Sequence, residues 1–379
     1  MIEDFFLNQL RGFEDTGLGT LVWLVWLGLM MLFLFYPTMS QRIQLGYMLR
    51  DLEKKLARLK LVKDEVRDRT IDTIKRVGKP EKDPTQDVDR LMEFFVIEPE
   101  SMDPYGIVYK LEHILEIGES KFEEEVKKLS PAAEDYKVKT LANLVEVART
   151  TNYLYRVVRH YYLLGKKTAN VYLILQLQML MPQLMEITEA LRLASYAFAY
   201  GQPIGDGIGV LAAAKLAYGK EKARYEIAKD TLVSEIEFEN RRVLVVRAAG
   251  PGGTVGRPGE GVKKLVEREG DNVKLIITID AGLRLEGDES GKMVEGVGVA
   301  IGGPGIDKYK IEEIAKERQI PLYALVIYES IVEAITPMRE VIAKAADTVV
   351  EKVKNVLLEK VPAGSTAIVA GIGNTVGIG

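Results

Sequence analysis

The stretch VKLIITIDA, residues 273–281, is an almost continuous apolar run, rich in β-branched side chains, that stops at an aspartate. Such runs are typical of parallel strands that are buried on both faces of a sheet. Two other segments have the same character, RVLVVRAA at 242–249 and PLYALVIYE at 321–329. MVEGVGVAIG and TAIVAGIG, nearer the C-terminus, have the composition of further strands.

Segments with helical patterns separate these strands. We expect helices at 207–216, 221–238, 259–269, 306–318 and 337–360. Strands that alternate with helices predict an α/β layered domain over residues 201–379, with a mostly parallel sheet. In such domains the functional groups lie at the carboxyl ends of the strands.

Three glycine-rich turns, GDGIG, AAGPGGTVGRPGEG and AIGGPGI, follow strands or open helices in this domain. Glycine permits positive φ and a close approach of a ligand, and the N–H groups of a following helix attract anions. The turns lack the Gly-Lys-Ser/Thr of a phosphate-binding loop, so they are a weak signal for a nucleotide site. The candidate ligand-binding residues are Gly205, Gly207, Gly252, Gly253, Gly302, Gly303 and Asn374.

Two aspartates are candidate catalytic residues. Asp206 opens a helix, where a carboxylate is favoured by capping and by the helix dipole, so it has a purely structural alternative. Asp280 ends the strand LIITID, at the position where α/β enzymes place catalytic side chains. Two such carboxyls could share a proton for general acid–base catalysis, or bind a metal.

The segment GDGIGVLAAAKL resembles the helix-opening motif of the hydrogenase maturation endopeptidases and the aspartate-bearing turn of the spore germination protease. The run KLIITIDAGLRLEG to IPLYALVIYESIVEAITPM resembles the same protease. In those families a GIGN strand leads directly into the aspartate helix, whereas here IVAGIGN is the final strand. The resemblance therefore implies a circularly permuted order, with residues 371–374 beside residues 205–209.

The resemblance matches Asp206 to the first acidic position of these peptidases and Asp280 to the second. The nickel site of the hydrogenase type also uses a histidine, and residues 201–379 contain none. An aspartate pair without metal or cofactor, acting on a peptide or protein, is what the resemblance implies.

The N-terminal part begins with a short acidic tail, residues 1–15, and then has no charged residue from Thr16 to Gln41. LGTLVWLVWLGLMMLFLFYP, residues 18–37, has the length and composition of a transmembrane helix. Basic residues follow it and acidic residues precede it. The pattern predicts a single-pass protein of the cell membrane with the N-terminus outside and the bulk of the chain in the cytoplasm, in contact with the lipid bilayer.

Residues 42–77 place leucines at heptad spacing, Leu45, Leu49, Leu52, Leu56 and Leu59. This spacing fits a coiled coil that would make a homo-oligomer, and it equally fits one amphipathic helix that packs on its own chain. Residues 78–200 read as a helical domain.

Three functions remain open: an aspartate peptidase, a non-catalytic scaffold that binds itself or a partner, and a small-ligand or nucleotide sensor. The net charge of −4 gives no electrostatic basis for nucleic-acid binding, and the lack of cysteine excludes thiol chemistry. IQLGYMLRDLEKKL, DRLMEFFVIEPESMDPYGIVYKLEHIL and RVVRHYYLLGKK are similar to an archaeal membrane-protein family of unknown function.

Overall fold

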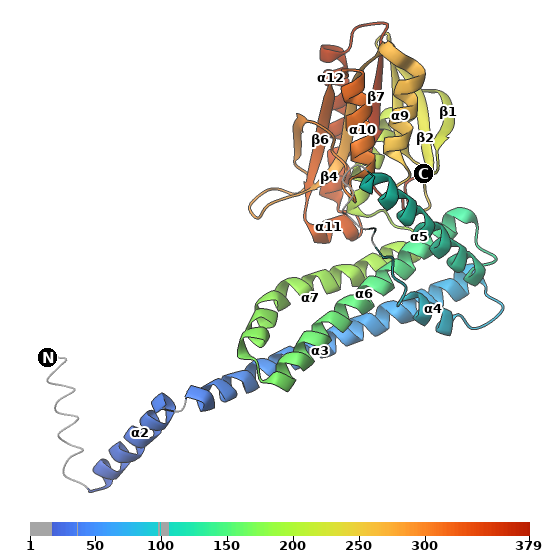
Figure 1. Ribbon diagram of the computed structural model, residues 1–379. Helices are drawn as coiled ribbons and strands as arrows, with labels where there is room; N and C mark the ends of the chain where they lie inside the picture. Colours follow the sequence, from blue (N-terminus) through green and yellow to red (C-terminus); the bar gives the residue numbers. More distant parts are fainter. Residues whose placement is uncertain (1–16, 36, 98, 100–105) are drawn as a thin grey trace, which may run out of the picture. The chain divides into compact units, whose positions relative to one another are not determined.

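The computed structural model describes residues 17–35, 37–97, 99 and 106–379 (Figure 1). Its contacts divide the chain into two compact units. One unit holds residues 1–58 and 156–183, and the other holds residues 59–155 and 184–379. The predicted tail of residues 1–15 lies outside the described residues.

Long helices make up the N-terminal half of the chain. Their bounds are α2 Gly17–Phe35, α3 Pro37–Thr73, α4 Thr85–Leu91, α5 Ile107–Leu129, α6 Asp135–Thr168 and α7 Val171–Tyr200. A π-helical turn, Ile74–Gly78, extends α3. Within the second unit, α3 and α7 are joined by Arg69, which donates to Ser195 Oγ at 2.5 Å, and by Arg76, which donates to the Ala199 carbonyl at 2.8 Å.

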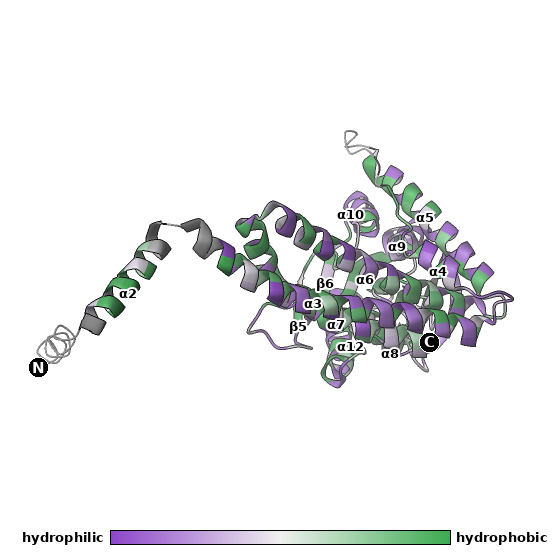
Figure 2. Ribbon diagram, turned by 90° about the horizontal axis from the view of Figure 1, so that it is seen from below, coloured by the Kyte–Doolittle hydropathy of each residue, from purple (hydrophilic) through white to green (hydrophobic). Residues whose placement is uncertain are grey.

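The predicted transmembrane helix of residues 16–41 overlaps α2 and the first residues of α3. Figure 2 shows hydrophobic residues along α2, but no helix among the described residues is both long enough and apolar enough to cross a bilayer. The predictions of a transmembrane helix and of a single-pass membrane location are therefore wrong.

The heptad leucines of α3 pack within the chain itself. Leu45, Leu52 and Leu59 are buried in this single chain, and Val62 and Val66 continue the stripe into the core of the second unit. The alternative interpretation, one amphipathic helix that packs on its own chain, therefore describes α3 in this structure. A coiled coil between chains stays a prediction.

The C-terminal domain is a sheet with helices on both faces (Figure 1). Seven strands of the described chain lie in the order β1-β2-β3-β7-β4-β6-β5. Their bounds are β1 Glu221–Ala228, β2 Thr231–Phe238, β3 Arg241–Ala248, β4 Val273–Leu283, β5 Met293–Val297, β6 Leu322–Glu329 and β7 Thr366–Gly371. The helices α8 Ile208–Ala217 and α12 Glu340–Lys360 cover one face, and α9 Pro258–Glu269 and α10 Ile306–Glu317 cover the other.

The sheet is mixed rather than mostly parallel. The central strands β3, β7, β4 and β6 are parallel, as their apolar runs predict, but β1, β2 and β5 pair antiparallel at the edges. The helix predicted at 221–238 is wrong: this segment is the β1–β2 hairpin. Asp230 turns the chain there with a φ of 54°, which asparagine and aspartate tolerate better than most residues.

The last strand, β7, lies in the middle of the sheet and brings the C-terminus to the start of α8. Gly209 of α8 sits against the sheet so closely that a Cβ would lie 2.3 Å from the Ile279 carbonyl oxygen and 2.4 Å from that of Ile372. The N–H of Asn374 donates to the Asp206 carboxylate at 2.8 Å. The expected adjacency of residues 371–374 and 205–209 is therefore present.

Candidate acid–base site

Three carboxyl side chains from three different elements approach one another at the carboxyl ends of the parallel strands. Asp206 lies in the 3-10 turn Gly205–Gly207 before α8, Asp280 lies near the end of β4, and Glu329 is the last residue of β6. The charge of Asp206 acts on the pKa of both other groups. This is the position at which open α/β sheets bind their ligands.

Asp206 does not cap the helix that it precedes. Neither the turn at Gly205–Gly207 nor α8 has a side-chain cap hydrogen bond. Instead Oδ2 accepts the N–H of Asn374, 168 residues away. Burial raises the pKa of Asp206 above its ordinary value, against the lowering effect of the Asn374 hydrogen bond. The structural alternative of a helix cap is thus excluded, and the carboxyl instead binds the segment that follows β7.

Asp280 is 5% exposed, and the backbone holds both of its oxygens. The N–H of Ala281 donates to Oδ1 at 2.8 Å, and the N–H of Gly302 donates to Oδ2 at 2.9 Å. These two bonds favour the carboxylate, but burial and the nearby charge of Asp206 outweigh them and raise the pKa of Asp280 to about 7. The group therefore changes charge near neutral pH.

Glu329 is a member of the cluster that the sequence analysis missed. Its side chain is 2% exposed, and neither carboxyl oxygen has a hydrogen-bond partner in the described part of the chain. Burial, followed by the charges of Asp206, Glu333 and Asp280, raises the pKa of Glu329 to about 8. The sequence does contain a signal for Glu329, because LVIYE ends an apolar strand with an acidic residue just as LIITID does.

The neighbouring Glu333, unlike Glu329, has hydrogen-bond partners for its carboxyl group. Burial would raise its pKa, but hydrogen bonds from Ser330, Ser290 and Arg339 prevail and lower the pKa of Glu333 to about 2. Ser330 and Glu333 form a capping box at the start of α11, Ile331–Ile335. Glu333 therefore has a structural role and stays ionised beside the proton-holding cluster.

A cavity of about 330 Å³ opens onto the two aspartates. Gly302, Gly303 and Gly373 line it together with Asp206 and Asp280. This places the two predicted catalytic residues, and two of the predicted ligand-binding glycines, around one space. Gly302 also orients Asp280 through its N–H.

The remaining candidate glycines lie in packed backbone or in a neighbouring cavity. A Cβ at Gly205 would lie 2.4 Å from Glu329 Oε2, and one at Gly207 would lie 2.7 Å from the Asn374 carbonyl oxygen. A Cβ at Gly252 would lie 2.7 Å from the Tyr136 carbonyl oxygen. These three glycines allow chain segments to approach closely.

Gly253 and Asn374 line a second cavity of about 370 Å³, which lies next to the first.

No group of three His, Cys, Asp or Glu side chains that could hold a metal ion occurs among the described residues. The chemistry that the cluster itself offers is proton transfer. Like charges in close proximity disfavour ionisation of every member, so the carboxyls titrate as a coupled group.

Family models match both halves of the chain. Residues 24–201 match the N-terminal domain of DUF1512, a protein of unknown function, and residues 204–379 match the C-terminal DUF1512 domain of unknown function. The chain belongs to the DUF1512 family. No curated protein matches this DUF1512 protein. The expected whole-chain similarity to a family of unknown function is confirmed, and all three clustered carboxyls lie in the C-terminal DUF1512 domain.

Proposed function

We propose that this DUF1512 protein is an aspartate-dependent peptidase in which Asp206 and Asp280 act as an acid–base pair. The observation that carries the proposal is the pair itself. Two carboxyls from a helix start and a strand end face one cavity, and the pKa of each is raised. Carboxyls with perturbed pKa values in a cleft are what general acid–base catalysis near neutral pH requires.

The electrostatics of the pair suggest the two roles. The charge of Asp206 contributes to the raised pKa of Asp280, so the shared proton rests on Asp280 and Asp206 is the carboxylate. Asp206 takes a proton from a water molecule, whose oxygen attacks the peptide carbonyl carbon. Asp280 then gives its proton to the amide nitrogen as the C–N bond breaks. Transfer of one proton from Asp206 to Asp280 returns the pair to its starting state.

The resemblance to the germination protease and the hydrogenase maturation endopeptidases supports a peptide as substrate. The aspartate turn, the strand with Asp280 and the GIGN segment lie together around the site, although GIGN comes last in the chain. This is the arrangement that a circular permutation of such a peptidase domain would give.

The test is cleavage of a proteome-derived peptide library, followed by mass spectrometry between pH 5 and pH 8. The wild-type protein should generate new peptide ends, and Asp206→Asn and Asp280→Asn should each lower the rate by at least a hundredfold. Asp271→Asn is the matched control, because Asp271 is exposed and lies outside the cavity. Cleavage that persists unchanged in both variants, or no cleavage by the wild type, would overturn the proposal.

A further inference from the structure

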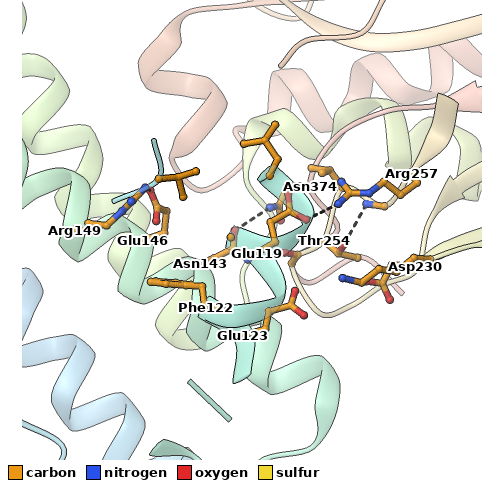
Figure 3. A pocket seen from close by; sticks show the side chains of 18 of the residues that line it. Glu119, Phe122, Glu123, Asn143, Glu146, Arg149, Asp230, Thr254, Arg257 and Asn374 are labelled. Carbon is orange, nitrogen blue, oxygen red and sulfur yellow. Dashed lines mark hydrogen bonds and ion pairs between the residues drawn. The ribbon is translucent and has the colours of Figure 1, made fainter. Parts of the chain in front are cut away.

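The second cavity, of about 370 Å³, adjoins the aspartate cavity. The two share Leu115, Glu119, Val255 and Arg257 as lining residues. Figure 3 shows this space between α5, α6 and the loop that carries Thr254 and Arg257. A chain bound across the aspartates would therefore place a neighbouring side chain in the second cavity.

Hydrogen bonds connect one side of the second cavity to the segment that contacts Asp206. Asn143 of α6 donates to the Gly253 carbonyl at 2.6 Å, and Thr375 Oγ1 accepts the N–H of Thr254 at 3.0 Å. Asn374, which lines the cavity, donates its own N–H to Asp206. A group bound against this side is thus held at a fixed place relative to the acid–base pair.

The other side is apolar. Phe94 and Phe122 lie with their ring centroids 5.8 Å apart, and Val96 and Leu115 extend the same wall. Of the residues of α5, all of which are described, only Val126 is buried. The apolar face of this amphipathic helix therefore points into an open cavity, which leaves side-chain surface available for a ligand.

Both arginines at the second cavity already have partners. Arg149 binds Glu146 and the Phe94 carbonyl, and Arg257 binds Glu119 at 2.6 Å. Because these two guanidinium groups are already paired with carboxylates, neither is available for an anionic ligand without loss of an ion pair. An uncharged, apolar side chain is the ligand that matches the wall formed by Phe94, Phe122, Val96 and Leu115.

We infer that the second cavity is the subsite that binds a bulky apolar side chain next to the peptide bond held at Asp206 and Asp280. The inference rests on the proposed peptidase function. Its substrates are then unfolded segments or peptides, since large apolar side chains are buried in folded proteins. Val255 lies where the two cavities meet and decides whether the side chain can enter.

Binding of two fluorescein-labelled decapeptides tests the subsite. They have the same length and charge, and one carries a central Phe-Leu pair where the other carries Ser-Ser. The Asp280→Asn full-length protein keeps the peptides intact, and fluorescence anisotropy measures the dissociation constants. We expect the Phe-Leu peptide to bind at least tenfold more tightly. Equal affinity for the two peptides would refute the subsite.

Two further variants locate the binding. Val255→Trp fills the junction and should abolish the tenfold preference, whereas Val297→Trp, at an exposed position of β5, should retain it. Leu115→Gln makes the wall polar and should weaken the preference in the same way. A preference that survives both Val255→Trp and Leu115→Gln would place the apolar side chain elsewhere and overturn the inference.

The binding measurement separates this inference from the proposed function. If the protein cleaves the library but binds the two peptides equally, the peptidase proposal is supported and the apolar subsite is refuted. If the protein cleaves nothing but binds the Phe-Leu peptide tenfold more tightly, and Val255→Trp removes this preference, the second cavity is an apolar peptide-binding site and the peptidase proposal is refuted.

Discussion

Replacement of Glu329 by glutamine should stabilise the protein in a pH-dependent way. Glu329 is 2% exposed and has no hydrogen-bond partner in the described chain, and its carboxyl adjoins Asp206 and Asp280. Ionisation at this position therefore places a charge in an environment that cannot solvate it. Glutamine has nearly the same shape and cannot ionise.

The magnitude follows from the pKa. Burial and the neighbouring carboxylates raise the pKa of Glu329 from 4.5 to about 8. A group with a raised pKa in the folded state contributes its full stability below pH 4.5, and this stability is lost as the pH rises toward 8. A difference of this size corresponds to about 5 kcal/mol of unfolding free energy, of which neighbouring groups can take up a part by relaxation.

The assay is urea unfolding followed by circular dichroism at pH 5 and pH 8.5. The advantage of Glu329→Gln over the wild type should grow by several kcal/mol between the two pH values. Glu317→Gln, at an exposed position of α10, should show no such growth. If Glu329→Gln and the wild type lose stability in parallel from pH 5 to pH 8.5, the assignment of a buried protonated carboxyl is wrong.

Two other changes probe the frame around the site. Gly209→Ala should destabilise by about 3 kcal/mol in urea unfolding, because the new methyl group would meet the Ile279 and Ile372 carbonyl oxygens. Gly296 has open space around it, so Gly296→Ala should change the free energy of unfolding by less than about 0.5 kcal/mol. Similar losses of stability at Gly209 and Gly296 would refute the close packing of α8 against the sheet. Arg257→Gln removes the ion pair to Glu119 and should speed amide hydrogen exchange in α5 severalfold, with α6 unchanged. Unaltered exchange in α5 would show that the ion pair does not hold this helix.

The sequence was sufficient to locate the central strands, because a strand buried on both faces must be apolar throughout. The segments RVLVVRAA, VKLIITIDA and PLYALVIYE became β3, β4 and β6. The hairpin at 221–238 was missed because its mixture of charged and apolar residues also fits a helix, and because its turn is Lys-Asp rather than a glycine turn.

The aspartate cluster was predictable only in part. Asp206 and Asp280 stood out because one precedes a helix and the other ends a strand, and the structure brings both to one cavity. Glu329 also ends an apolar strand, but its place beside the aspartates depends on the order of the strands, because β6 pairs with β4. The missing hydrogen-bond partners of its carboxyl are a property of tertiary packing, which no local pattern encodes.

The most direct test of the acid–base pair is an NMR titration of the protein labelled with ¹³Cγ-aspartate. Asp280→Asn identifies the Asp280 resonance by its loss. The account predicts that this carboxyl titrates near pH 7 and that Asp206→Asn lowers its midpoint, since the charge of Asp206 contributes to the raised pKa. An Asp280 midpoint below pH 5 that Asp206→Asn leaves unchanged would contradict the account.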